Sequence, residues 1–259
     1  MRIVVLVKPV PDPASGMERL GPDQRLDRAA APPVINGNDE YALEAALKMA
    51  GTDGEVILLA MAPGNGLDAL RKGLAMGAHR AVQVTDDALA GSDWLATARV
   101  LAAALGELEF DLVLAGADTS DGGGGVVAAG VAALAGLPYL SYAAAIEPKG
   151  GRVRVKRITA SGYEEIEAPT PAVIACTQAL GAPRYPSLKG IMAARSKEIA
   201  KRSLAELGVD PATVGTAAAG TRVVGSRKPE ARAATKIVRE NPDEAARQVV
   251  AFLAERRIV

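Results

Sequence analysis

The first half of the chain alternates between short apolar runs and longer segments with helical spacing. Arg2–Val7 is a continuous run rich in β-branched residues, which is typical of a strand buried on both faces of a sheet. Three further runs have strand character, and four segments place apolar residues on one helical face. The strands are Glu55–Met61, Arg80–Val84 and Phe110–Gly116, and the helices are Asp39–Ala50, 66–77, 92–106 and Val126–Ala135. This strict alternation predicts an α/β fold with a doubly wound, mainly parallel sheet.

Polar and small residues at the helix boundaries predict where the helices begin and end. Asn38 or Asp39 is expected to cap the first helix, and Ser92 the third. Gly77 and Gly106 are expected to end the second and third helices.

Beyond Pro138 the pattern changes to short strands joined by glycine turns. We expect a hairpin of Arg152–Thr159 against Tyr163–Ala168, followed by a strand at Ala172–Thr177. The last part of the chain is basic and then rich in Ala, Gly and Thr, before a helix-like end at 242–259. It has too few large apolar residues for a core of its own. We therefore expect a domain over 1–202 and an arm over 203–259 that packs on a partner chain; the alternative is a disordered tail with one loose helix.

Three loops follow the expected strands at their carboxyl ends, and all three are unusual. They are Lys8–Asn38, Ala62–Gly66 and Ala117–Gly125. Ligands of doubly wound sheets bind at that edge, near the point where the strand order reverses. The first loop spans about thirty residues without a clear period, and loops of that length inside a domain are usually functional.

Charge and cysteine content exclude several classes of function. Lys+Arg and Asp+Glu are balanced at 30 each, so net charge indicates neither a nucleic acid nor an anionic membrane as partner. A single cysteine, Cys176, and a single histidine, His79, exclude an intrachain disulfide and metal centres built from several of either residue. We interpret Cys176 as a buried strand thiol and His79 as a loop residue. No signal peptide or membrane-length apolar run is present, so a cytoplasmic location is expected.

Four consecutive glycines, Gly122 to Gly125, stand between the fourth strand and the fourth helix. Bare backbone N–H groups at a helix start bind phosphate, so the loop is a candidate phosphate cradle, with a flexible turn as the alternative. Neither the Gly-x-Gly-x-x-Gly fingerprint nor a P-loop is present. Asp118 and Asp121 are able to hold Mg²⁺, although turn residues of this type more often cap the backbone. No Ser-His-Asp set can be assembled, so we expect nucleotide binding with no catalytic residue and no metal.

Three segments then carry a family resemblance. The stretches "VINGNDEYALEAAL" (Val34–Leu47), "ALRKGLAMGAHRAVQV" (Ala69–Val84) and "GAPRYPSLKGIMAARSK" (Gly181–Lys197) resemble motifs of electron transfer flavoprotein β subunits. The resemblance runs from Arg2 to about Gly208. The glycine run is similar to that of actinobacterial-type members of the family.

This resemblance implies a Rossmann-like domain of the adenine nucleotide α-hydrolase-like kind within an α/β heterodimer. The heterodimer carries one FAD, held mainly by the α subunit, while the β subunit binds AMP and extends an arm around the α subunit. Electrons pass from acyl-CoA dehydrogenases of fatty acid oxidation to a membrane quinone oxidoreductase. One alternative is a bifurcating β subunit with a second FAD at the AMP site, and another is a stand-alone nucleotide-binding domain of the stress-protein type.

The resemblance also assigns the residues that contact AMP. In relatives the glycine loop carries side-chain ligands, whereas here Gly123 stands for an Asp and Val126 for a Gln, so we expect the backbone N–H groups of Gly124–Val127 to bind the phosphate. Such a loop should accept almost nothing but glycine. The full set is Leu6, Asn36, Gly37, Asn38, Asp39, Met61, Gly116, Ala117, Asp118, Thr119, Ser120, Asp121, Gly122, Gly123, Gly124, Gly125, Val126 and Val127.

A second set of residues is implied to contact partner proteins or the flavin. Leu180 corresponds to a leucine that anchors in a pocket of the dehydrogenases, and Pro183, Arg184 and Tyr185 follow it in the family motif. Glu147 corresponds to an acid near the flavin, and Pro13 stands where some relatives carry an aromatic residue. Basic side chains on the same segment either steer acidic partners or form a solvated helix face; they are Lys189, Arg195 and Lys197.

Overall fold

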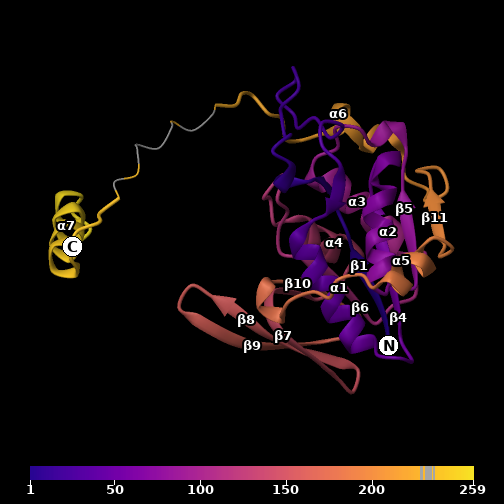
Figure 1. The fold of residues 1–259 in the computed structure, drawn as a ribbon. Helices are drawn as coiled ribbons and strands as arrows, with labels where there is room; N and C mark the ends of the chain where they lie inside the picture. Colours follow the sequence, from indigo (N-terminus) through magenta and orange to yellow (C-terminus); the bar gives the residue numbers. More distant parts are fainter. Residues whose placement is uncertain (228–229, 231–234, 236) are drawn as a thin grey trace. The chain divides into compact units, whose positions relative to one another are not determined.

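The N-terminal apolar run forms β1 (Arg2–Leu6), which lies in the middle of a parallel sheet in the computed structural model (Figure 1). The structure describes all residues except 228–229, 231–234 and 236. The described residues divide into two compact units, Met1–Val224 and Gly225–Val259.

The sheet of the first unit has nine strands among the described residues, in the order β11-β5-β4-β1-β6-β10-β7-β8-β9. All pairings from β11 to β7 are parallel, and β8 and β9 extend the sheet in antiparallel fashion. The strands that follow β1 build outward on one side through β4 and β5, and the chain then crosses β1 to β6. The strand order therefore reverses between β1 and β6. The remaining bounds are β4 (Glu55–Met61), β5 (Arg80–Val84), β6 (Leu112–Gly116), β7 (Tyr139–Lys149), β8 (Arg152–Thr159), β9 (Gly162–Pro169), β10 (Ala172–Cys176) and β11 (Ile199–Arg202).

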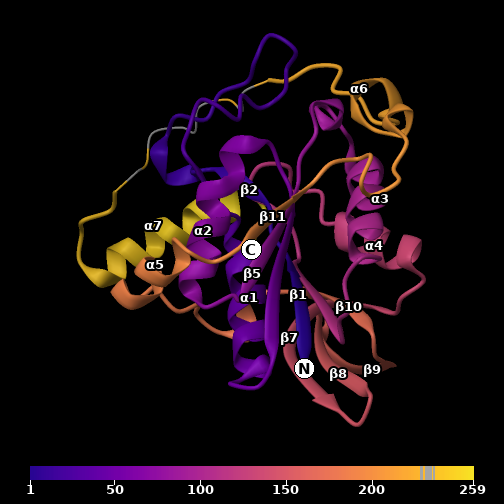
Figure 2. The ribbon, with the colours of Figure 1, turned by 90° about the vertical axis from the view of Figure 1, so that its right-hand side faces the viewer.

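Helices cover both faces of the sheet, so the predicted doubly wound α/β class is confirmed. Figure 2 shows α1, α2 and α5 on one face and α3 and α4 on the other. The short α6 (Gly215–Ala218) packs near the 3₁₀ turn Asp87–Leu89. The bounds of the others are α1 (Gly37–Ala50), α2 (Leu67–Met76), α3 (Trp94–Leu105), α4 (Val127–Ala135) and α5 (Leu188–Ala194).

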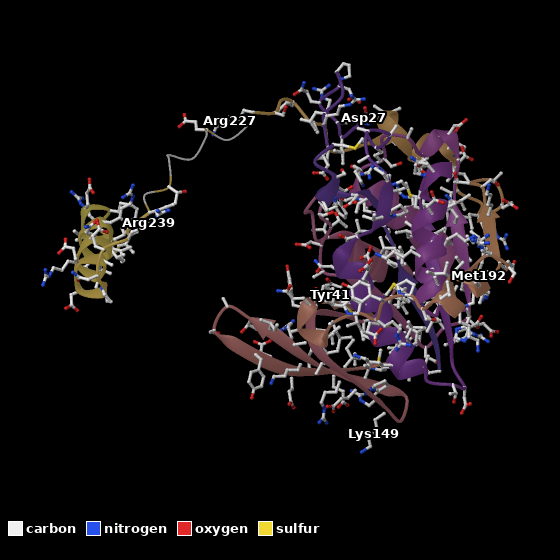
Figure 3. The ribbon with its side chains drawn as sticks, in the orientation of Figure 1. Asp27, Tyr41, Lys149, Met192, Arg227 and Arg239 are labelled. Atoms are coloured by element: carbon white, nitrogen blue, oxygen red, sulfur yellow. The ribbon has the colours of Figure 1, made fainter. Side chains whose placement is uncertain are left out.

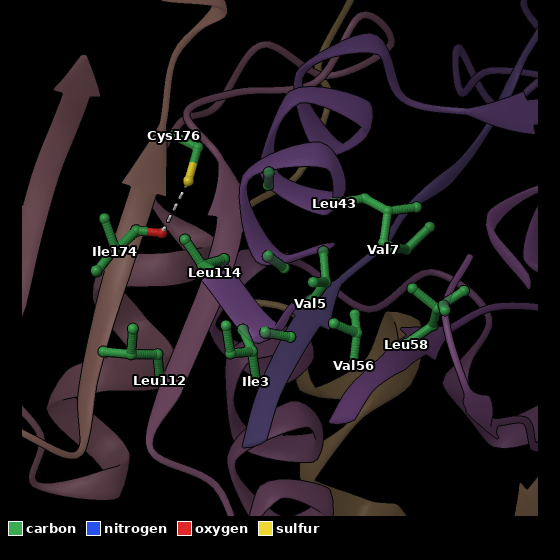
Figure 4. Packing of buried hydrophobic residues seen from close by; sticks show 14 of the residues in the cluster. Ile3, Val5, Val7, Leu43, Val56, Leu58, Leu112, Leu114, Ile174 and Cys176 are labelled. Atoms are coloured by element: carbon green, nitrogen blue, oxygen red, sulfur yellow. Dashed lines mark hydrogen bonds between the residues drawn. The ribbon is translucent and has the colours of Figure 1, made fainter. Parts of the chain in front are cut away.

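Each face of the sheet carries its own apolar cluster, because successive side chains of a strand point to opposite faces. Ile3 and Val5 join the cluster beneath α1 and α2, whereas Val4 and Leu6 join the cluster beneath α3 and α4. Figure 4 shows the first cluster, with Leu43 of α1 packed over the strands. Burial on both faces explains why β1 is apolar throughout.

Cys176 closes β10 as the buried strand thiol that its flanks predict. Its Sγ donates weakly to the carbonyl of Ile174 at 3.9 Å (Figure 4). Burial raises the pKa of this thiol well above its ordinary value, so the thiol is held in its unreactive protonated form.

The predicted helix caps of α1 and α3 were wrong. α1 begins one to two residues earlier than expected, with Asn36 at its N-cap position and no side-chain cap. α3 is capped by Asp93, whose carboxylate accepts from the N–H groups of Leu95 and Ala96, while the Ser92 hydroxyl instead accepts from Gly215 N–H at 2.9 Å. A cap predicted from sequence assumes that the side chain bonds to the backbone of its own helix. The side chains of Asn38, Asp39 and Ser92 instead bond to residues far away in the sequence.

Four strands were missed by sequence reasoning. The long loop after β1 contains an antiparallel pair, β2 (Pro9–Pro11) and β3 (Pro33–Ile35). The segment after Pro138 forms the eleven-residue strand β7, which pairs with β10 along its first half and with β8 along its second. The basic stretch "IAKR" forms the edge strand β11 beside β5.

The chain beyond Ser203 belongs partly to the first unit. Leu204 and Val214 are buried in the cluster beneath α3, so the first turns of the expected arm pack on the sheet domain. The second unit contains α7 (Pro242–Glu255), capped by Asn241, and none of the helix's side chains is buried. No helix in the described part of the chain is both long and apolar enough to cross a membrane.

Because the central strands are buried on both faces, shortening one of their side chains should cause a large loss of stability. Leu58 of β4 is fully buried, so L58A should lower the free energy of unfolding by about 2–5 kcal/mol through lost transfer energy and a cavity. The control I158A changes an exposed side chain of the hairpin and should stay within about 0.5 kcal/mol. Chemical denaturation measures both, and equal effects would contradict the assignment of the core.

Candidate functional site

The residues predicted to contact a nucleotide gather where the strand order reverses. β1 and β6 are neighbours in parallel register, with Val5 opposite Leu114, so their carboxyl ends meet at one edge of the sheet. The start of α1 and the glycine loop lie at that edge. Doubly wound sheets place their ligands in this position.

Asn36 joins the start of α1 to the glycine loop. Its side-chain amide donates to the carbonyl of Asp118 at 2.8 Å and accepts from Ser120 N–H at 3.1 Å. Asn38 also donates to the Asp118 carboxylate. Asn36 therefore cannot cap α1, because both ends of its amide already hold the loop.

Asp39 connects the ends of β1 and β6. One carboxylate oxygen accepts from Lys8 N–H at 2.8 Å and the other from Gly116 N–H at 3.0 Å. A Cβ at Gly116 would lie 2.4 Å from the Asp39 oxygen, so only glycine allows this approach. Burial raises the pKa of Asp39 to about 7, although both N–H bonds and the charge of Lys8 oppose the rise.

Two cations that sequence reasoning missed lie at the glycine loop. Lys8 Nζ is 2.8 Å and an Arg28 guanidinium nitrogen 2.6 Å from opposite oxygens of Asp121, whose side chain is only 1% exposed. Burial would raise the pKa of Asp121, but the bonds and charges of these cations hold it far below its ordinary value. Lys8 lies two residues after the end of β1, and this position at the edge of the sheet could have identified it from the sequence. Arg28 stands in a segment without periodicity, so no sequence pattern pointed to it.

The glycine loop presents unpaired backbone donors. Gly123 N–H donates to the carbonyl of Thr119 at 2.8 Å, which folds the loop back on itself. Within the described parts of the chain, no group accepts a hydrogen bond from the N–H groups of Gly124, Gly125, Val126 or Val127. Val127 begins α4, so these donors stand at a helix N-terminus, where anions bind.

The expectation that the whole loop requires glycine was too broad. Gly123 and Gly125 have φ of +55° and +63°, a region that favours glycine. Gly122 and Gly124 do not, and a Cβ at either would meet no atom closer than 3.6 Å. The backbone alone therefore requires glycine at two of the four positions.

The remaining nucleotide candidates lie at the ends of the neighbouring strands. Leu6 ends β1 in the cluster beneath α3, and Met61 ends β4, half-buried against the same cluster. Gly37 is the first residue of α1, and the Ala117 N–H donates to the Cys176 carbonyl at 2.9 Å.

A buried amide fixes the loop after β4, which was not foreseen. Gln83 of β5 donates to the carbonyls of Ala62 and Pro63 at 3.2 and 2.8 Å.

The two aspartates considered for Mg²⁺ already have partners in the protein. Asp118 accepts from Asn38, and Asp121 pairs with Lys8 and Arg28. No group of three or more His, Cys, Asp or Glu side chains in the described part of the chain is placed to hold a metal ion.

The predicted partner residues lie on a separate part of the surface, beside α1 and α5. Leu180 is half-buried against the apolar cluster, whereas Tyr185 is 94% exposed. The Arg184 guanidinium does not point freely outward, because it binds Glu44 of α1 at 2.7 Å. Pro183 precedes it in a segment without regular secondary structure.

The basic residues of this segment differ in their surroundings. Lys197 Nζ donates to the carbonyls of Leu74 and Ala78 near the end of α2, at 3.1 and 2.6 Å, and burial lowers its pKa. Lys197 is therefore held against the end of α2 and is not part of a solvated helix face, and its role in steering a partner stays a prediction. Lys189 and Arg195 are exposed.

Glu147 and Pro13 lie outside the cluster at the strand ends. Glu147 is exposed on β7, opposite Arg154 of β8, two residues before Lys149 at the hairpin turn (Figure 3). Pro13 begins a 3₁₀ turn (Pro13–Ser15) after β2.

The fold and its gathered polar groups define a Rossmann-like, doubly wound α/β protein. Comparison with known proteins narrows this class. A family model described as the electron transfer flavoprotein domain matches residues 25–207. The chain therefore belongs to the electron transfer flavoprotein family.

Curated relatives place the chain among the β subunits of that family. It is 41% identical to the electron transfer flavoprotein subunit beta of Mycobacterium leprae (strain TN), and 40% identical to that of Mycobacterium tuberculosis (strain ATCC 25618 / H37Rv), over 99% of each chain. It is 34% identical, over the full length of both chains, to subunit CarD of the caffeyl-CoA reductase-Etf complex of Acetobacterium woodii.

The raised pKa of Asp39 predicts an unusual pH dependence. A carboxyl whose pKa is higher in the folded state contributes stability below its unfolded pKa, and that contribution is lost as pH rises through 7. From about pH 4 to 8, the unfolding free energy of the wild type should therefore fall relative to that of D39N, by up to about 1.4 kcal/mol per pH unit. Denaturation at each pH measures the difference.

The control for this prediction is D27N. The Arg19 hydrogen bond lowers the pKa of Asp27 below its unfolded value, so Asp27 is ionised in both states above about pH 5, and the difference between the wild type and D27N should stay nearly constant up to pH 8. A wild-type stability that rises relative to D39N over this range would show that Asp39 is stabilised as a carboxylate.

Proposed function

We propose that this chain binds one AMP as a structural nucleotide and helps to enclose an FAD held mainly by the α subunit of the heterodimer. The observation that carries the proposal is the set of N–H groups from Gly124 to Val127, which have no hydrogen-bond partner among the described residues and lie next to Lys8 and Arg28. Backbone donors at a helix start and nearby cations together favour a phosphate.

Lys8 and Arg28 lie beside the glycine loop together with the carboxylates of Asp118 and Asp121. Charge does not separate AMP from FAD, because a phosphate monoester carries about two negative charges at neutral pH, as a pyrophosphate diester does. A second FAD at this position, as in a bifurcating β subunit, is therefore the alternative that the nucleotide content must decide. Membership of a family of subunits disfavours a stand-alone nucleotide-binding domain.

The chain's part in electron transfer is to hold and present the flavin. FAD, when bound in the heterodimer, accepts and donates the electrons. We propose acyl-CoA dehydrogenases as donors and a membrane quinone oxidoreductase as acceptor.

An exposed apolar surface supports the donor contact. Tyr185, Leu188, Ile191 and Met192 are all exposed around the start of α5, and Figure 3 shows Met192 on its outer side. Such clustering on a surface is typical of protein contacts. Because Leu180 is half-buried, we place the centre of this docking surface on these four residues rather than on Leu180 alone.

The C-terminal unit is suited to binding the α subunit. Val249, Val250 and Phe252 of α7 are exposed. An amphipathic helix with no buried side chain gains stability only from a partner. We therefore propose that α7 packs on the α subunit.

Nucleotide content tests the proposal directly. The heterodimer should release one AMP and one FAD on denaturation, as measured by chromatography. K8M should weaken AMP binding by about tenfold or more, because it removes a charge-assisted contact, and should leave the FAD content unchanged. The control K149M alters an exposed lysine at the hairpin turn and should leave both unchanged. Two FAD per heterodimer would contradict the AMP assignment.

A further inference from the structure

Glu44 is a buried carboxylate that the nucleotide site does not use. It lies in the middle of α1, and its side chain is 6% exposed. Buried acids are rare in proteins unless they are paired. Its partner is Arg184, which lies 140 residues further along the chain.

Arg184 reaches this carboxylate through both its backbone and its side chain. Its N–H donates to Glu44 Oε2 at 3.1 Å, Nε donates to the same oxygen at 2.7 Å, and Nη2 donates to Oε1 at 3.2 Å. Lys48 Nζ lies 3.5 Å from Oε1. A bidentate pair with an added backbone bond fixes orientation as well as distance.

The segment around Arg184 has few other attachments. Residues 181–187 form no helix or strand between the 3₁₀ turn Gln178–Leu180 and α5. Among the described residues, the only hydrogen bonds made by residues 182–186 are those of Arg184 to Glu44. Packing holds the two ends of the segment, with Leu180 against the apolar cluster and α5 on α2, and Glu44 provides the hydrogen bonds between them.

The segment carries the surface that we propose for donor docking. Tyr185 is 94% and Leu188 is 78% exposed, directly after Arg184 and at the start of α5. Nε and Nη2 of Arg184 are committed to Glu44, although 46% of the Arg184 side chain is exposed at the surface. Burial would raise the pKa of Glu44, but the bonds to Arg184 lower it, so the pair stays charged at neutral pH.

We infer that Glu44 is a positioning residue for electron-donor docking, which holds the segment 181–187 through Arg184 so that Tyr185 and Leu188 face the partner. This inference rests on the proposed function of that surface. It gives Arg184 the role of an anchor to α1, beside the partner contact that its motif implies.

The test compares E44Q with the wild type in the purified heterodimer. E44Q should leave the FAD and AMP contents unchanged, accelerate amide hydrogen exchange in residues 181–187, and raise KM for an acyl-CoA dehydrogenase by about fivefold with little change in kcat. The matched control is E40Q, since Glu40 lies on the same helix and pairs with Lys72. E40Q should match the wild type in each measurement.

A double-mutant cycle separates positioning from a general loss of charge. If Glu44 acts through Arg184, then E44Q in an R184M background should cause no further rise in KM. The variant E44M/R184M leaves no unpaired buried charge, which preserves folding, and it should show the same raised KM.

A third variant, L188A, distinguishes failure of the positioning role of Glu44 from failure of the proposed docking surface. If L188A raises KM while E44Q does not, the positioning role is wrong and the docking surface stands. If neither variant raises KM, docking occurs elsewhere and both proposals fail. Loss of FAD or AMP from E44Q would show that Glu44 is a structural residue of the whole domain, which also overturns the inference.

Discussion

The carboxylate of Asp39 holds together the two strand ends between which the sheet changes direction. Each of its oxygens accepts a backbone N–H, one from Lys8 after β1 and one from Gly116 at the end of β6. The edge between these strands would otherwise leave both donors without a protein partner. By bonding to both strand ends, the Asp39 side chain of α1 fixes the position at which Lys8 leaves the sheet and the position at which the glycine loop begins. This pair of hydrogen bonds requires a glycine at position 116 and an acid at position 39. It also requires that the Asp39 carboxyl group be buried away from water, which costs free energy.

Helix α1 joins the two regions to which we assign function. Its first residues bind the glycine loop and both strand ends, and Glu44, less than two turns further along, anchors the segment of Arg184. A rigid helix transmits position along its length because its backbone is internally hydrogen-bonded. The start of α1 therefore lies at the proposed nucleotide site, and its middle holds Arg184 beside the proposed docking surface.

Sequence patterns predicted the sheet better than they predicted the site. Runs such as "EVILLAM" and "RAVQV" gave β4 and β5 with their observed ends, because burial on both faces leaves an unbroken apolar run. The start of α1 was predicted two residues too late. The bonds of Asn36 to the glycine loop and of Asp39 to β6 join residues too far apart in the sequence for spacing to reveal. The same holds for Arg28 with Asp121 and for Glu44 with Arg184, which are 93 and 140 residues apart.

The most direct test of the account is a crystal structure of the heterodimer at a resolution that shows the nucleotide. The nucleotide of this chain should lie at the carboxyl ends of β1 and β6, with its phosphate within hydrogen-bond distance of backbone N–H groups between Gly124 and Val127. Asp39 should keep both of its bonds to Lys8 and Gly116. A phosphate bound away from the glycine loop, or an Asp39 carboxylate turned away from the strand ends, would contradict the account.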